Sequence, residues 1–128
     1  MNHVVPITYR ERIARAIAGE SVLLAPFRLT LGNGRWDASS GAVIPPAPTD
    51  TGVVSPLPGY TDLPVTVSRQ GRTVHIHINV PGGSAMVLVS ELGVFTEDGV
   101  AVILDAFRPF PLEAPLTFQA TYTIYPDV

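Results

Sequence analysis

Two histidines separated by one residue are the first side chains that suggest chemistry. His75 and His77 lie in the run from Thr73 to Val80, in which apolar and polar residues alternate. Side chains two residues apart in a strand lie on the same face, and neutral imidazole is a common metal ligand. A closed metal site needs further ligands, but the chain has no cysteine and His3 is distant in sequence. Three such pairs on the axis of a trimer would supply a six-nitrogen site. We favour the alternative, a polar strand face without a metal or other cofactor.

The acidic residues suggest a second kind of chemistry, because paired carboxylates catalyse hydrolysis. Glu97 and Asp98 precede Gly99 and belong to a turn, and Asp105 follows an apolar run. Glu91 stands between two apolar stretches, where a buried carboxylate needs hydrogen bonds or an arginine. We favour a structural glutamate that fixes the hairpin. The alternative is a small hydrolase that uses Glu91 with His75 or His77.

Two other chemical motifs are incomplete. Ser84 and Ser90 lack the glycine pattern of a nucleophile elbow, so a catalytic triad is not expected. The segment Gly32-Asn33-Gly34 lacks the lysine and the following helix of a phosphate-binding loop.

Aromatic residues near prolines leave two interpretations open. Phe107, Phe110 and Tyr125 would form a sugar- or peptide-binding platform if exposed, or ordinary core if buried. Trp36, the only tryptophan, stands at the start of a long irregular segment.

The composition excludes several classes of protein. The 128 residues carry a formal charge of −3, contain neither lysine nor cysteine, and are 15% charged, against about 25% in an average domain. No disulfide framework and no apolar run long enough to span a membrane is present, and we expect no signal peptide. Scattered arginines in an acidic chain disfavour nucleic-acid binding. The low charge suggests that partner subunits cover part of the surface.

One helix is expected, over about residues 8–18. Thr8 and Glu11 have the spacing of a capping box, and Gly19 is a natural stop. The stripe formed by Tyr9, Ile13 and Ile17 would face the core or another subunit.

The remainder predicts strands around a long loop. Phe27 to Leu31 alternates and ends in the Gly-Asn-Gly turn, and residues 32–62 form a loop that contains five prolines. Antiparallel strands follow over about 63–125, with 85–89 buried on both faces and a Pro-rich turn at 108–111. We therefore predict one domain, residues 1–128, in the mainly β (α+β) class: a small antiparallel sheet or sandwich with one N-terminal helix.

The order of these segments resembles the N-terminal module of phage tail-collar fibre proteins. The segments are YRERIARAIAGE, FRLTLGNG, the Pro-rich loop and, most specifically, SELGVFTEDGVAVI. In the last segment the matching positions are Glu91, Gly93, Phe95, Asp98 and Gly99, and the resemblance implies that they are structural.

The resemblance also implies a role without catalysis. The module joins tail fibres to the baseplate, so the chain would be a structural part of a virion, assembled in the host cytoplasm, usually as a trimer. Its partners would be itself and other tail, baseplate or fibre proteins. The main alternative is a β-module that binds carbohydrate through exposed aromatics. We expect the following residues at an oligomer or partner interface: Tyr9, Ile13, Ile17, Trp36, Phe107 and Phe110.

Overall fold

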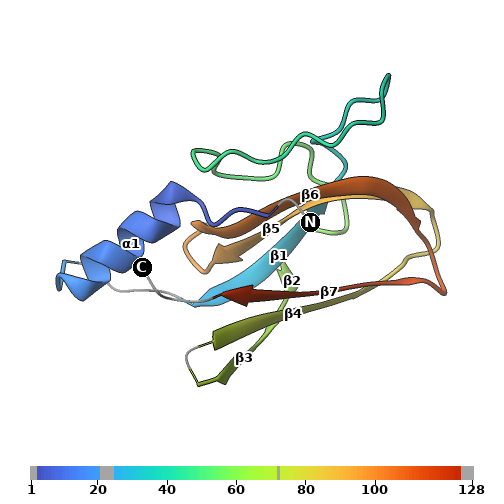
Figure 1. Cartoon of the computed structure of the whole chain (residues 1–128). Coiled ribbons are helices and arrows are strands. Elements are labelled where there is room, and N and C mark those ends of the chain that lie inside the picture. The colour runs from blue at the N-terminus through green and yellow to red at the C-terminus, as the bar shows by residue number, and fades with distance from the viewer. Residues whose placement is uncertain (1–2, 21–24, 72, 125–128) are drawn as a thin grey trace.

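The computed structural model describes residues 3–20, 25–71 and 73–124, which form two antiparallel sheets and one helix (Figure 1). This confirms the predicted mainly β class with a single N-terminal helix among the described residues. One sheet has four strands in the spatial order β2 (Leu63–Pro64), β1 (Pro26–Gly32), β5 (Val87–Thr96) and β6 (Ala101–Leu112). The other has the order β3 (Thr66–Gln70), β4 (Thr73–Pro81) and β7 (Thr117–Ile124).

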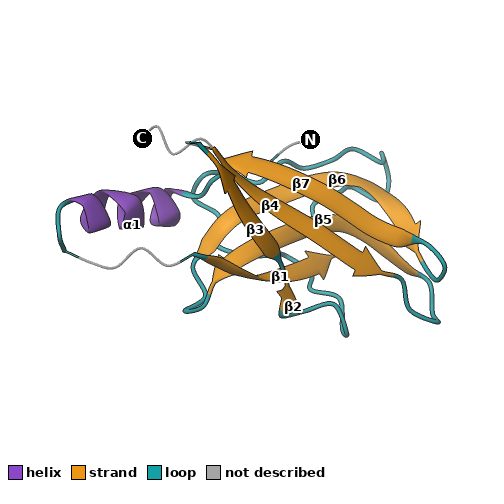
Figure 2. Cartoon of the chain, turned by 90° about the horizontal axis from the view of Figure 1, so that it is seen from below, coloured by secondary structure: helices purple, strands orange, loops and turns teal. Residues whose placement is uncertain are grey.

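The core lies between the two sheets, which Figure 2 shows as stacked layers. In β4 the predicted alternation is confirmed: Ile76, Ile78 and Val80 are buried, whereas His77 and Asn79 are exposed. Alternating apolar side chains from both inner faces thus build one shared core, as is typical of sandwiches.

The prediction that residues 85–89 form a strand buried on both faces is wrong. Strand β5 begins at Val87, and the side chains of Met86 and Leu88 are 52% and 40% exposed. Strand β1 pairs with β5 from Glu91 to Thr96, so among the described strands the first part of β5 is paired with β6 alone. Complete burial of β5 therefore starts at Val89.

The Pro-rich turn expected at 108–111 is also wrong, because these residues belong to β6. The pairing shifts register where Val89 opposes Phe110 but Glu91 opposes Ala106, which is a bulge. Proline is tolerated at bulges and on edge strands, since its missing N–H breaks no bond there. The chain turns instead at residues 113–116, before β7.

Helix α1 (Ile7–Ile17) begins one residue earlier than predicted and has no capping box. The N-cap is Pro6, and the carbonyl of Pro48 accepts the hydrogen bond from Ile7 N at 2.8 Å. Because the helix already begins at Ile7, Thr8 lies within its first turn and is not at the N-cap position. The stop at Gly19 is confirmed: Gly19 has φ 78°, its N–H donates to Ala16 O, and Glu20 N donates to Arg15 O. These bonds form a Schellman motif.

The segment between β1 and β2 is long and irregular, as predicted, but it is tied down by backbone bonds. A short hairpin runs from Arg35 to Ile44, closed by a Trp36–Val43 bridge and by Ile44 N donating to Arg35 O. The segment then returns along β1, where Leu57 N donates to Leu31 O at 3.0 Å. Figure 1 shows it on the side of β5 and β6 that faces away from the second sheet.

Candidate functional site

The carboxylate of Glu91 is the centre of a buried hydrogen-bonded cluster beneath the long loop. Glu91 is 0% exposed, and its Oε2 accepts from Gly34 N at 2.7 Å and from Ser55 N at 2.9 Å. Its Oε1 accepts from Val54 N at 2.9 Å and lies 3.3 Å from Arg35 Nε. Charge-assisted bonds of this kind are the strongest in proteins. We call this cluster, together with Ser90, the loop anchor.

Two consecutive side chains of β5, opposite a bulge in β6, contact the same loop residue. Ser90 Oγ donates to Gly34 O at 2.6 Å, while the adjacent Glu91 accepts from Gly34 N. Successive side chains of a regular strand point to opposite faces, but the register shift between Val89 and Glu91 removes that alternation. The loop is therefore fixed by both polar groups of the Gly34 backbone.

Three glycines allow the loop to approach this closely. A Cβ on Gly32 would lie 2.5 Å from Val53 Cγ1, and one on Gly34 would lie 2.5 Å from Glu91 Oε2. A Cβ on Gly93 would lie 3.0 Å from Val53 Cγ2 of the loop, and 2.8 Å from the Phe95 ring of its own strand. The Gly-Asn-Gly turn and the Glu-Leu-Gly-Val-Phe run, distant in sequence, are thus two halves of one packing site.

Arg35 links the anchor to the rest of the loop. Its side chain is 7% exposed, NH1 binds Asp50 Oδ2 at 2.9 Å, and NH2 donates to Gly52 O at 2.7 Å. The bond from Ala47 N, followed by the bond from Arg35, holds the pKa of Asp50 below its ordinary value. No sequence pattern predicts the roles of Arg35 and Asp50, because neither residue belongs to a motif and the ion pair between them depends on the path of the loop.

The acidic tip of the β5–β6 hairpin is a separate polar site. Asp98 accepts from Thr96 Oγ1 at 2.5 Å and binds Arg12 of α1 at 2.7 Å. The Arg12 bond, then the Thr96 bond, lowers the pKa of Asp98 to about 2. Gly99 has φ 89°, a conformation that favours glycine, so the predicted Asp-Gly hairpin is confirmed. Asp98 also docks the helix on the sheet.

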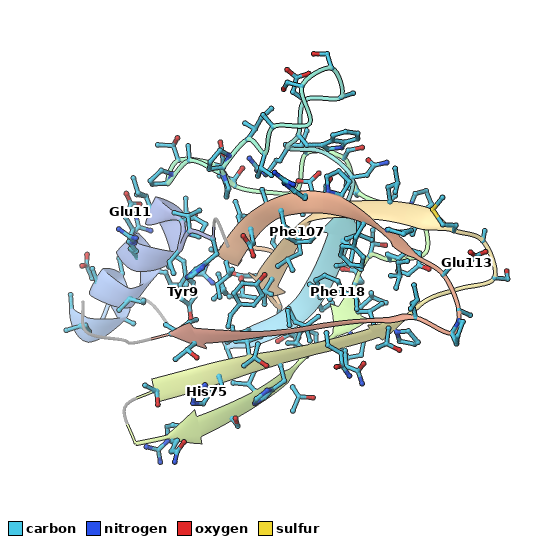
Figure 3. The ribbon with its side chains drawn as sticks, turned by 45° about the vertical axis from the view of Figure 1, so that its right-hand side comes forward. Tyr9, Glu11, His75, Phe107, Glu113 and Phe118 are labelled. Carbon is cyan, nitrogen blue, oxygen red and sulfur yellow. The ribbon has the colours of Figure 1, made fainter. Side chains whose placement is uncertain are left out.

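The histidine pair lies on the outer face of the three-stranded sheet. The ring centroids of His75 and His77 are 6.2 Å apart, and Figure 3 shows His75 on the outer side of β4. His75 Nδ1 is 3.1 Å from Thr123 Oγ1, and His77 Nε2 is 2.9 Å from Ser68 Oγ. Among the described residues, no three His, Cys, Asp or Glu side chains are grouped as metal ligands would be.

The structure does not bring Glu91 and the two histidines together. Glu91 lies under the loop on the four-stranded sheet, whereas His75 and His77 belong to the other sheet and face outward. The pairing on which a hydrolase interpretation would depend is therefore not formed within the chain.

Asp105 and Tyr122 form a buried polar contact between the sheets. Asp105 of β6 is 0% exposed, accepts from the Tyr122 hydroxyl of β7, and accepts from Ala106 N at 2.8 Å. Burial and the Asp105 bond raise the pKa of Tyr122 far above its ordinary value. The phenol therefore stays protonated and donates.

Of the two interpretations of the aromatic residues near prolines, the structure supports ordinary core for the two that it describes, Phe107 and Phe110. Phe107 and Phe110 stack with Phe118, at centroid distances of 5.7 and 5.3 Å, and pack against the core. Figure 3 labels Phe107 and Phe118. They are therefore half-buried rather than displayed for a sugar or for another subunit. Tyr125 lies outside the described residues.

The other expected interface residues differ in exposure. Tyr9 is buried within the chain and Ile13 is half-buried against the core, which agrees with the core alternative for these two residues of the stripe. Ile17 is 80% exposed. Trp36 lines an open hollow of about 480 Å³ together with Leu88 and other residues.

No protein-family model, curated protein or solved structure matches this chain. Within the described segments, no helix is long and apolar enough to cross a membrane. The loop anchor combines four hydrogen bonds and one ion pair around Ser90 and Glu91. These contacts hold the long loop in one conformation.

Proposed function

We propose that the chain is a non-enzymatic structural component of a phage or phage-like tail, an adaptor between baseplate and fibre. It would act as a homo-oligomer within the virion and contact other tail proteins. The proposal starts from the resemblance of the segment SELGVFTEDGVAVI to tail-collar fibre proteins.

The observation that carries the proposal is the loop anchor. Glu91 and Gly93, near the start of that segment, hold the long loop against β5. A loop fixed on a rigid sheet is a common way to present a recognition surface. This supports a role in which the resembling segment is a scaffold and the loop is the contact surface.

The bonding of Glu91 supports a role without catalysis. Both carboxylate oxygens already accept backbone N–H groups, and Arg35 offsets the charge. A general acid or base must reach a proton of the substrate, whereas this carboxylate is enclosed by the protein.

Exposed apolar side chains support assembly with other subunits. Ile44 and Val54 of the anchored loop are exposed, as are Ile17 of α1 and Met86 before β5. Apolar surface combined with few charges is typical of surfaces that partners cover. Burying the two loop side chains would add to binding without a further ordering cost, since the loop is already held.

Deletion of the gene in the cells that produce the particle tests the proposal. We expect tails with baseplates but without attached fibres in electron micrographs, and loss of the chain from purified particles by mass spectrometry. Complementation with Glu97→Ala, an exposed substitution, should restore the fibres. Glu91→Ala, which removes the centre of the anchor, should not.

Fully fibred particles from the deletion strain would contradict the adaptor role. Absence of the chain from purified wild-type particles would contradict the structural role as a whole.

A further inference from the structure

Three of the four sheet edges carry a feature that discourages pairing with another strand. Strand β2 has only two residues, and β3 places the exposed charge of Arg69 on its five-residue edge. Strand β6 contains Pro109 within a bulge and Pro111 just beyond it, and Val4 covers part of the strand with two backbone bonds to Leu104. Short strands, charges, prolines, bulges and covering segments are the known means of protecting an edge.

Within residues 3–20, 25–71 and 73–124, none of these features is found at strand β7. Its eight residues, Thr117–Ile124, contain no charge, proline or glycine. They pair with β4 without a register shift, from Val74↔Ile124 to Pro81↔Thr117. Within the described part of the chain, β4 is its only neighbouring strand. Figure 2 shows β7 at the margin of the β3–β4–β7 layer.

We propose that the free edge of β7 pairs with β7 of a second copy of this chain. The two strands would run antiparallel about a two-fold axis perpendicular to the sheet. The two three-stranded sheets would then form one continuous six-stranded sheet, in the order β3-β4-β7-β7-β4-β3.

The sequence of β7 suits pairing with itself. A two-fold axis places each residue of β7 opposite a residue on the same face of the other copy. The exposed row of Thr117, Gln119 and Thr121 would therefore lie opposite the same row of the second copy. Thr–Thr pairs hydrogen-bond across strands, while like charges placed opposite are destabilising. Because β7 has no charge, self-pairing has no such repulsion.

Pairing of β7 with β3 of another copy is less favourable. Both β3 and β7 run antiparallel to β4 and are therefore parallel to each other. A rotation about an axis along the strands would join them as a parallel pair, which is less stable per residue. It would also place the exposed Arg69 in the contact.

The inference does not depend on the proposed tail function, since it concerns two copies of the isolated chain. The expected species has twice the mass of the 13.7 kDa chain. Sedimentation velocity over a concentration series should show this dimer. Hydrogen exchange should show β7 amides that become protected as concentration rises.

A pair of charge variants locates the contact. Gln119→Lys with Thr121→Lys places like charges near the axis for any register centred on residues 119–121 and should weaken dimerisation by about tenfold or more. The control, Thr66→Lys with Gln70→Lys, adds the same charge on the outer face of β3 and should leave the dimer intact. Circular dichroism confirms that both variants fold.

Mixing opposite charges provides the decisive measurement. Gln119→Glu with Thr121→Glu should also be monomeric alone, but an equimolar mixture with the lysine variant should restore a dimer. A wild type that stays monomeric at all concentrations would overturn the inference. A dimer or trimer that is insensitive to the β7 charges would also overturn the inference. Such a trimer would indicate assembly through other surfaces.

Discussion

Glu91 and Asp98 belong to the same hairpin, but their surroundings give the two carboxylates different roles. Glu91 is enclosed and accepts three backbone N–H bonds, whereas Asp98 lies at the exposed tip and binds Arg12. A buried acceptor is costly to remove because its donors are then left without partners. An exposed ion pair contributes little to stability, but it shifts a measurable pKa.

Glu91→Ala should lower the free energy of unfolding by about 3–5 kcal/mol, because Arg35 and three loop amides lose a buried partner. Urea unfolding measures this loss. Glu97→Ala, at an exposed position nearby, should change stability by less than about 0.5 kcal/mol. Equal effects of the two substitutions would contradict the role assigned to the loop anchor.

Arg12→Gln should raise the pKa of Asp98 from about 2 toward the ordinary 3.8, since the Arg12 bond is the largest cause of the shift. Carboxyl carbon shifts in an NMR titration report this value. In the wild type the pKa is lower in the folded chain than in the unfolded one. The stabilisation is therefore fully present above about pH 4 and is lost as the pH falls through about 2.

The control for this titration is Arg15→Gln on the same helix, which should leave the pKa of Asp98 unchanged. An unchanged Asp98 titration in Arg12→Gln would show that the helix does not bind the hairpin tip in solution.

At the scale of elements, the long loop is held by glycines as much as by polar groups. Gly32 ends β1, and a Cβ there would lie 2.7 Å from Ser55 O as well as close to Val53. The backbone carbonyl cannot move aside as the end of a flexible side chain would. The loop, the end of β1 and the part of β5 around Glu91 therefore depend on one another.

Gly32→Ala should displace the loop and cost about 1–3 kcal/mol, as overpacking does. Chemical denaturation measures the loss, and limited proteolysis should show faster cleavage within residues 33–62. Gly52→Ala in the same loop is the matched control, because a Cβ there meets no atom within 4 Å. Wild-type resistance to protease in Gly32→Ala would disprove this account of the packing.

At the scale of the whole molecule, the two sheets are joined by apolar packing and by one buried polar contact. Tyr122 of β7 donates to Asp105 of β6 across the core. A buried hydrogen bond to a charged group fixes the relative position of the layers more narrowly than apolar contacts do.

Tyr122→Phe should cost about 1–3 kcal/mol of unfolding free energy, because buried Asp105 loses its phenol donor. Thermal and urea unfolding measure it. Tyr60→Phe removes a hydroxyl that accepts only an exposed bond from Gly83 N, and it should cost less than about 1 kcal/mol. A neutral Tyr122→Phe would mean that the sheets are aligned by packing alone.

Local patterns were sufficient to predict much of the fold. The alternation in β4, the Asp-Gly hairpin and the Gly19 helix stop each depend on neighbouring residues, so each could be read directly from the sequence. The sequence predicts a turn at the prolines of β6, whereas the structure has a strand there. An edge position and a bulge are properties of the sheet, so the segment alone does not reveal them.

The sequence alone determined a mainly β chain with one short helix, a long irregular loop and a glutamate that would need partners if buried. The tertiary structure decided which partners those are: Gly34, Val54, Ser55 and Arg35 reach Glu91 from as far as 57 residues away. It also decided that Phe107 and Phe110 face the core and that β7 lies at an open edge. The reason is physical: secondary structure follows the period of neighbouring side chains, whereas burial and edge positions arise only when distant strands pack together.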